Sequence, residues 1–402
     1  MKLLVIAPAL PMPDRTSGDY RFFQLLRLLA GRFDVRLSVH AVSGQQRLFG
    51  AAAVAEYLIQ TRGIGVEVLS ATPLEAVQAG NYDAVLFEFY TAARGLIEEV
   101  RFRCPAAVVV VDSVDVHFSR ELLKARMTNN PADLAEALDI KAEELACYRA
   151  ADLVIAVTAQ DQERLHSELP AVRTAIIPNL HEVPAFSSAI GRVANQLLFV
   201  GGFRFRPNVD AALYFTSEIL PLIRTVIPDA RLVIAGESPP PEVLQLACDM
   251  VTVPGYVPDL AACYREASVS VAPLRYGGGM KGKVGEAMAH GLPVVTTSVG
   301  AEGFGFSLGR NVLVGDTAEA FAAAVISLLT NRPLYDQIRY AGWQFIRDHY
   351  SLDAVAAPVL SIFAGVADIP AQRLPLYMRI YKSIPISIRR RLWGMRRGRS
   401  EP

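Results

Sequence analysis

The chain has 402 residues, of which 52% are hydrophobic and 20% charged, so it is long enough for two ordinary domains, each with its own core. Its 40 basic residues balance its 40 acidic ones, which excludes a general electrostatic preference for nucleic acid or other polyanions. No apolar run reaches the roughly 18 residues that a membrane-spanning helix needs.

The N-terminal apolar run, residues 3–7, is too short for a signal peptide and is interpreted as a buried first strand. The cysteines lie far apart in apolar surroundings and lack the spacing of a metal site or a redox pair. They are Cys104, Cys147, Cys248 and Cys263. We therefore expect reduced core thiols, no bound metal ion, and a cytoplasmic protein.

The first half of the chain alternates short, continuously apolar runs with amphipathic stretches. Runs without polar alternation are typical of strands that are covered on both faces, as in a parallel sheet. The predicted strands are residues 3–7, 35–39, 66–69, 84–87, 107–111 and 153–157. Repeated βαβ units are thus expected in a first domain, residues 1–187.

A dense group of polar residues follows the predicted strand at 107–111. Ligands of doubly wound folds bind beyond the carboxyl ends of the strands, so this position favours a functional site. The alternative is that the histidine is structural and that the arginine only pairs with a neighbouring carboxylate. The residues are Asp112, Asp115, His117 and Arg120.

The pattern of apolar runs begins again after residue 188. The predicted strands are residues 196–200, 230–235, 250–253, 268–272, 293–297 and 311–314. We therefore expect a second domain, residues 188–365, followed by a tail, residues 366–402. The fold class is α/β, with two doubly wound, Rossmann-like domains that face each other across an interdomain cleft.

The most specific stretch of the sequence is a glycine loop between a strand that ends at Pro273 and a helix that begins near Met280. Free backbone N–H groups and the positive end of a helix dipole together hold an anionic diphosphate. Lys281 and Lys283 add cations, and Glu286 is suited to accept hydrogen bonds from a ribose diol. The alternative is a charged, solvated helix face.

This stretch resembles family 4 of the retaining GT-B glycosyltransferases, the glycosyl transferases group 1, whose donor domain has a glycine-rich loop and an E-A-M-A-x-G-x-P-V-V block. That block is matched by residues 286–295, and residues 199–202, 232–236 and 253–260 support the likeness over nearly the whole chain. The resemblance implies retaining transfer of a sugar from a nucleotide-diphosphate donor to a hydroxyl of a glycan or glycolipid acceptor, in polysaccharide or glycolipid biosynthesis. It implies neither a cofactor nor a nucleic acid partner.

The resemblance also implies roles for individual residues. Asp115 and His117 contact the transferred sugar, Lys281 and Lys283 stabilise the leaving phosphate, and Asp112 and Arg120 contact the acceptor. The implied donor-binding residues are Gly18, Gly201, Gly202, Arg204, Arg206, Gly236, Tyr256, Val257, Gly278, Gly279, Met280 and Glu286.

Two departures from the family pattern bear on the donor. The family often has a glutamate where this chain has Gly278, and the family's Arg and Lys pair is displaced to the region of Arg204 and Arg206. Both a hexose and a deoxyhexose therefore stay open as the donor sugar. A sugar-nucleotide epimerase or a phosphorylase on the same fold and a non-catalytic sugar-nucleotide binder are the alternatives.

The C-terminal tail mixes aromatic and aliphatic residues with arginines and has no acidic residue between positions 374 and 398. Such a segment is typical of peripheral contact with an anionic membrane surface, here the inner face of the cell membrane. The alternative is a helix that packs on the first domain with its arginines solvated.

Overall fold

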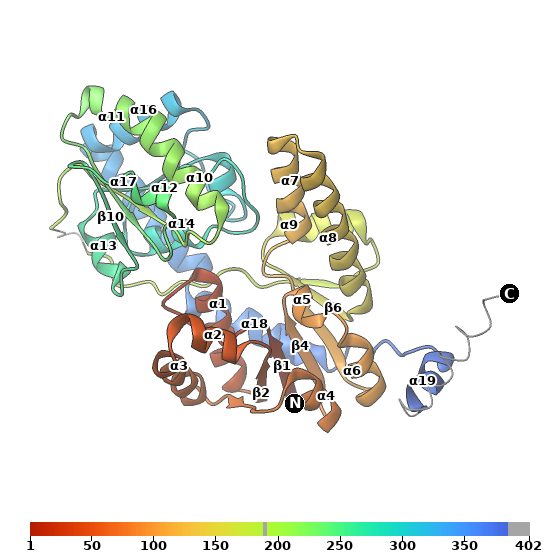
Figure 1. Ribbon diagram of the computed structural model, residues 1–402. Helices are drawn as coiled ribbons and strands as arrows, with labels where there is room; N and C mark the ends of the chain where they lie inside the picture. The colour runs from red at the N-terminus through yellow and green to blue at the C-terminus, as the bar shows by residue number, and fades with distance from the viewer. Residues whose placement is uncertain (188–190, 385–402) are drawn as a thin grey trace.

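A computed structural model describes residues 1–187 and 191–384 and shows two parallel sheets, each covered by helices on both faces (Figure 1). The first sheet has seven strands in the order β3-β2-β1-β4-β5-β6-β7. They are β1 (Lys2–Ala7), β2 (Asp34–Val39), β3 (Glu67–Val68), β4 (Ala84–Glu88), β5 (Val108–Asp112), β6 (Leu153–Ala156) and β7 (Thr174–Ile176).

Alternate side chains of the central strands enter two separate cores. In β1, Leu3 and Val5 pack on one side of the sheet, and Leu4 and Ile6 pack on the other. The helices of this half are α1 (Ser17–Ala30), α2 (Val42–Phe49), α3 (Ala51–Gly63), α4 (Pro73–Ala79), α5 (Tyr90–Ala93), α6 (Ile97–Arg103), α7 (His117–Thr128), α8 (Pro131–Ala150) and α9 (Ala159–Glu168).

The second sheet has six parallel strands in the order β10-β9-β8-β11-β12-β13. They are β8 (Gln196–Val200), β9 (Arg231–Ala235), β10 (Val251–Gly255), β11 (Val269–Ala272), β12 (Val294–Thr296) and β13 (Leu313–Val314). The remaining helices are α10 (Arg206–Tyr214), the π-helical turn η1 (Phe215–Ile219), α11 (Leu220–Val226), α12 (Pro241–Leu244), α13 (Leu260–Glu266), α14 (Gly282–Ala289), α15 (Ser298–Ala301), α16 (Ala318–Thr330), α17 (Arg332–Tyr350), α18 (Leu352–Val366) and α19 (Leu376–Ser383).

Helix α18 corrects the expected end of the second domain at residue 365. Its buried side chains Val355, Val359 and Phe363 belong to the core of the first domain, beside α1. The chain therefore crosses back between the domains at Ser351, next to the outward crossing at His181, whose backbone N–H donates to the carbonyl of residue 350 at 2.9 Å.

Candidate active site

The carboxyl ends of β5 and β11 meet at the interface between the two domains. A Cβ atom on Gly279 would lie 3.2 Å from Asp115 Cβ, and one on Gly278 would lie 3.5 Å from Arg120 Cβ. Gly279 has a φ of +61°, which a residue with a side chain rarely adopts. The structure thus brings together glycines and polar residues that the sequence places in different halves of the chain.

The N-termini of α1 and α14 also meet at this interface. A Cβ atom on Gly282, the first residue of α14, would lie only 2.3 Å from Ser17 Cβ, at the first residue of α1. Both helices therefore direct their positive ends to one region, where an anion is stabilised by unpaired N–H groups and by both dipoles. The helix begins at Gly282, two residues after Met280, and Lys281 is its N-cap.

Lys281 is buried at this junction, with 6% of its surface exposed. Its Nζ donates to the carbonyl of Gly279 at 2.6 Å and lies 3.7 Å from Glu302 Oε2. Burial lowers the pKa of Lys281, and the Glu302 carboxylate opposes that shift. Glu302 also pairs with Arg164 of the first domain, so its charge is shared between two cations.

Lys283 is two residues further along α14 and has a neutral partner. Its Nζ donates to Asn208 Oδ1 and lies 4.9 Å from the centroid of the Phe199 ring. Burial, and then the charge of Lys281, lower the pKa of Lys283 to about 7. A buried amine and a partly buried one, on residues two apart, favour the binding of an anion, which would restore the charge of Lys283.

Asn208 connects Lys283 to the predicted glycine turn. Its Nδ2 donates to the carbonyl of Gly202 at 2.7 Å, and a Cβ on Gly201 would lie 2.7 Å from Asn208 Cγ. A Cβ on Gly236 would lie 1.9 Å from the carbonyl oxygen of Gly201. Gly201 and Gly236 thus allow close packing behind Lys283, whereas a Cβ on Gly202 would meet no atom within 4 Å.

His117 and Asp115 lie in the turn between β5 and α7. His117 Nε2 is 3.2 Å from Asp115 Oδ1, and Arg120 donates to Asp115 Oδ2. Val114, just before them, has a φ of +58°, an uncommon backbone for a β-branched residue and typical of functional turns. The structure therefore groups three of the predicted residues and holds them next to the glycine loop.

A buried glutamate on α8 anchors this group, and the sequence did not identify it. Glu144 is fully buried and accepts hydrogen bonds from the backbone N–H groups of His117 (3.1 Å) and Phe118 (2.8 Å). The Tyr148 hydroxyl donates to the same carboxylate at 2.7 Å. Because these are the first N–H groups of α7, Glu144 fixes the start of the helix that carries His117. Glu144 shares one side of α8 with Ala137, Cys147 and Tyr148, which are also buried, and a carboxylate in such a set is the signal that could have found it.

Asp112 does not have the predicted acceptor-binding position. Its side chain is fully buried and receives two hydrogen bonds from Arg21, at 2.7 and 3.2 Å. Arg21 also donates to the carbonyl of Ile177 at 2.8 Å. Asp112 is therefore corrected to an internal anchor that joins the end of β5 to α1, because no face of its carboxylate is left for an acceptor.

The predicted donor residues Arg204 and Arg206 are separate from the lysines. Their side chains are 57% and 70% exposed and pair with Glu237 (3.4 Å) and Glu242 (3.2 Å). Met280 is buried, and its carbonyl accepts a hydrogen bond from Asn179 at 3.1 Å. None of these three side chains thus converges with Lys283.

Tyr256 contacts the first domain at the edge of the interface. Its hydroxyl donates to Asp14 Oδ2 at 2.7 Å, while the Tyr57 hydroxyl donates to Asp14 Oδ1 at 2.6 Å. The Arg15 guanidinium lies 4.7 Å from the centroid of the Tyr256 ring. Burial and Asp14 raise the pKa of Tyr256 to about 12. Val257 is partly buried and packs against the core of the second domain.

Glu286 and Gly18 flank the helix junction. Burial raises the pKa of Glu286 to about 7, and the Tyr264 hydroxyl partly offsets this shift. A Cβ on Gly18 would have Thr16 Oγ1, at 3.8 Å, as its nearest neighbour, so the close approach expected at Gly18 is made by Ser17 instead.

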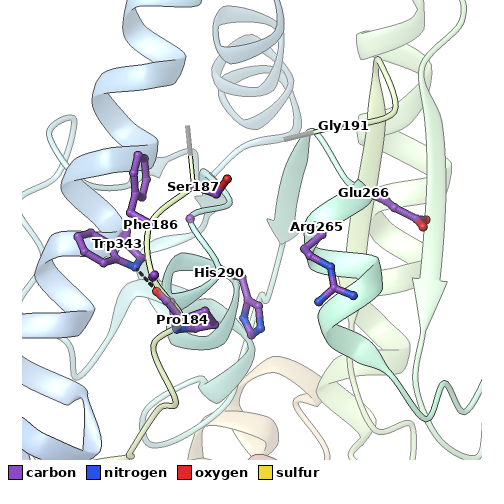
Figure 2. A pocket seen from close by; sticks show the side chains of 11 residues that line it. Pro184, Phe186, Ser187, Gly191, Arg265, Glu266, His290 and Trp343 are labelled. Carbon is purple, nitrogen blue, oxygen red and sulfur yellow. Dashed lines mark hydrogen bonds between the residues drawn. The ribbon is translucent and has the colours of Figure 1, made fainter. Parts of the chain in front are cut away.

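A cavity of about 380 Å³ lies elsewhere, between residues 184–187 and the second domain (Figure 2). Pro184, Phe186, His290 and Trp343 are among its lining residues, and Trp343 Nε1 donates to the carbonyl of Pro184 at 2.9 Å. No predicted site residue lines it. Within residues 1–187 and 191–384, no three His, Cys, Asp or Glu side chains are grouped as a metal site requires.

No helix in the described part of the chain has both the length and the apolar character needed to cross a membrane.

Residues 194–331 match the family described as glycosyl transferases group 1. The chain is similar to a phosphatidyl-myo-inositol mannosyltransferase of Mycobacterium leprae, with 31% identity over 208 residues, 48% of this chain and 53% of the relative. It is also similar to an uncharacterized 44.6 kDa protein in the cps region of Klebsiella pneumoniae, with 25% identity over 174 residues, 41% of this chain and 45% of the relative. The chain thus spans about half the length of the curated relatives it matches.

Solved structures share the architecture. Sucrose-phosphate synthase from Thermosynechococcus elongatus matches with a TM-score of 0.66 and 17% identity, over 91% of this chain and 99% of the other. HepE of Anabaena, solved with UDP-glucose, matches with a TM-score of 0.62 and 14% identity, over 91% and 100%. At these identities the likeness shows the fold. With the match over β8 to α16, it leads to one conclusion: residues 194–331 form a domain of the glycosyl transferases group 1 type, in a chain that has the GT-B fold.

Proposed function

We propose that the chain is a nucleotide-sugar-dependent glycosyltransferase that moves a hexosyl or deoxyhexosyl group to an acceptor hydroxyl with retention of anomeric configuration. The observation that carries this proposal is the meeting of two helix N-termini, at Ser17 and Gly282, beside the buried amine of Lys281 and the partly buried amine of Lys283. A site of this kind binds a dianionic or trianionic group, and the diphosphate of a nucleotide sugar has the matching charge.

Cleavage of the bond between sugar and diphosphate places negative charge on the leaving phosphate. Groups that are fixed before the reaction and stabilise this charge lower the barrier without reorganisation. We assign this task to the N–H groups at the start of α14 and to Lys283. The pKa of Lys283 is about 7, and a bound anion would raise this pKa, so that the amine keeps its proton and its charge. Lys281, already bonded to Gly279, supports the shape of the loop.

The transferred sugar is proposed to face the group formed by Asp115, His117 and Arg120. Asp115 and Arg120 of this group lie next to Gly278 and Gly279 across the interface, so the group faces the glycine loop from the first domain. The leaving phosphate is proposed to take the proton of the acceptor hydroxyl on the same face of the sugar, which retains configuration. Glu144 keeps the start of α7 in place during the reaction.

The names of similar proteins support the substrate class. One curated relative is a mannosyltransferase, another is encoded in a cps region, and a structural neighbour was solved with UDP-glucose. A hexose donor and an acceptor in polysaccharide or glycolipid assembly agree with these names. A cytoplasmic site of action agrees with the supply of nucleotide sugars.

The test is a donor screen that follows nucleoside-diphosphate release with and without a cell-envelope lipid and glycan extract. The variant Lys283→Met keeps the length of the side chain and removes its charge; Lys141→Met is the control, because that amine pairs with Glu168 at the surface. We expect extract-dependent release that falls about 100-fold or more in Lys283→Met and stays unchanged in the control.

Other outcomes separate the alternative functions. Conversion of the nucleotide sugar without any acceptor would identify an epimerase or a hydrolase. Tight donor binding with no turnover of any donor would identify a binding protein, a possibility raised by Gly278 in place of a side chain. Equal activity of Lys283→Met and the wild type would refute the assigned role of this amine.

A further inference from the structure

A row of charged side chains crosses the interface between the two domains beside the glycine loop. Lys281 Nζ, at the start of α14, lies 3.7 Å from Glu302 Oε2. The other carboxylate oxygen of Glu302 accepts a hydrogen bond from Arg164 Nη2, on α9 of the first domain. Arg164 also donates to Asp161 Oδ1 at 3.1 Å. One carboxylate of the second domain is therefore shared between a cation of each domain.

The backbone next to Glu302 is in close contact with the first domain. Gly303 has a φ of +89°, and a Cβ atom on it would lie 2.5 Å from Thr158 Cγ2 and 2.9 Å from Met280 Cγ. Thr158 is the N-cap of α9, the helix that carries Arg164. The turn at residues 302–303 thus lies between the start of α9 and the end of the glycine loop, with no room for a side chain at Gly303.

Lys281 connects this row of charges to the glycine loop. Its Nζ also donates to the carbonyl of Gly279 at 2.6 Å, and Gly279 lies next to Asp115 of the first domain. An ammonium group has three donors, so it can serve the carbonyl and the carboxylate of Glu302 at the same time. A buried ammonium group needs such partners, and the shape of the loop therefore depends on Glu302 as well as on Lys281.

The charge of Glu302 opposes the effect of burial on Lys281. Burial lowers the pKa of Lys281, and Glu302 is the strongest of the groups that raise it. The other charged groups that face this amine are Asp161, Asp115, Arg164 and, two residues along α14, Lys283. Removal of the Glu302 charge would lower the pKa of Lys281 further, so the amine would lose its proton at a lower pH.

We propose that Glu302 is a positioning residue for the diphosphate site: it holds Lys281 with one oxygen and Arg164 with the other, so that the glycine loop takes its binding shape when the two domains touch. The inference rests on the proposed function, because it states how the diphosphate site of that function is completed. Arg164 of the first domain thereby affects nucleotide affinity through Glu302. An ion pair that only joined the domains would have no effect on the charge of Lys281.

The experiment measures the affinity of the full chain for nucleoside diphosphates by titration calorimetry over a range of pH. The probes are the diphosphates of uridine, guanosine, adenosine, cytidine and thymidine. The test variants are Glu302→Gln, Arg164→Met and the double variant, with Arg164→Lys as the conservative replacement. The matched control is Glu168→Gln, because Glu168 is also on α9, is 33% exposed against 37% for Arg164, and pairs with Lys141 inside the first domain. The far-ultraviolet circular dichroism of each variant verifies that it is folded.

We expect Glu302→Gln to bind the diphosphate about tenfold more weakly or worse, because a neutral amide replaces the carboxylate between two cations. As the pH rises, its affinity should fall at a lower pH than that of the wild type, since Lys281 has lost its main counter-charge. Arg164→Met should bind more weakly without this shift, because the Arg164 charge lowers the pKa of Lys281. The double variant should bind no more weakly than Glu302→Gln alone, and Arg164→Lys should keep part of the affinity that Arg164→Met loses.

Unchanged affinity of Glu302→Gln would overturn the proposal, and so would an equal loss in Glu168→Gln. A loss of affinity in Glu302→Gln without a shift of its pH dependence would also overturn it, since Glu302 would then be a structural contact only. The variant Lys283→Met separates this inference from the proposed function. Diphosphate binding that falls in Lys283→Met but not in Glu302→Gln would leave the transferase proposal intact, whereas no binding of any diphosphate by the wild type would contradict both.

Discussion

The contact between Gly282 and Ser17 allows a test of how closely the two domains approach each other. The test adds one methyl group at Gly282. In Gly282→Ala the new Cβ would lie 2.3 Å from Ser17 Cβ, whereas carbon atoms in contact lie about 3.5–4.0 Å apart. The two helix N-termini must therefore move apart by about 1.5 Å. Overpacking of this kind costs about 1–3 kcal/mol, which corresponds to about 5- to 150-fold in the population of the closed arrangement.

The assay is the affinity for a nucleoside diphosphate by titration calorimetry, with donor turnover as a second measurement. We expect Gly282→Ala to bind about 5- to 150-fold more weakly while each domain stays folded. The variant Gly282→Ala/Ser17→Gly should recover most of the affinity, because the nearest remaining Ser17 atom, Cα, is 3.8 Å from the new Cβ. Gly365→Ala, on α18 with no neighbour within 4 Å, is the control and should bind like the wild type.

Wild-type affinity in Gly282→Ala would refute the reasoning, since the helices would then not need to approach so closely. A failure of Ser17→Gly to rescue the affinity would show that the added methyl group acts elsewhere, for example on the start of α14 itself.

Further predictions concern the buried charges. Arg21→Met leaves Asp112 buried without its cation and should lower the free energy of unfolding by about 3–5 kcal/mol in urea titration; a loss below about 1 kcal/mol would contradict the importance of this pair. Binding of a nucleoside diphosphate above pH 7 should take up a proton at Lys283, whose pKa is about 7, so the calorimetric heat should depend on the buffer in the wild type and less so in Lys283→Met. Burial raises the pKa of Glu286 from 4.5 to about 7, so the native state binds a proton that the unfolded state has lost, and the free energy of unfolding should fall as the pH rises between these values. Glu286→Gln should flatten this part of the plot of thermal unfolding midpoint against pH. An unchanged slope would contradict the raised pKa of Glu286.

The strands were predictable because both sheets are buried on both faces. A short apolar run is enough for such a signal. In β5, the valines at Val108–Val111 are continuously apolar and pack alternately into the two cores of the first domain. The edge strand β7 was missed because its three residues are only half-buried and carry no continuous apolar pattern. The role of α18 was missed because an amphipathic helix does not reveal which of two domains it covers.

The site was predictable where backbone geometry limits the residue type. The glycine loop and the start of α14 are of this kind, since Gly279 needs a positive φ. Side chains that act through distant partners were less predictable: Asp112 was read as a ligand contact because nothing in its own stretch shows that Arg21 neutralises it. Glu144 was missed for the same reason, since its partners lie on another helix. Pairing across long sequence separations is decided by topology, which local patterns do not contain.

The two adjacent crossings between the domains impose an order on biosynthesis. The first domain buries Val355 and Phe363 of α18, but the whole second domain is translated between β7 and that helix. While the ribosome is still making the second domain, the first domain exposes the patch beside α1 that α18 will cover. The half of the protein that begins the chain is therefore the half that is completed last.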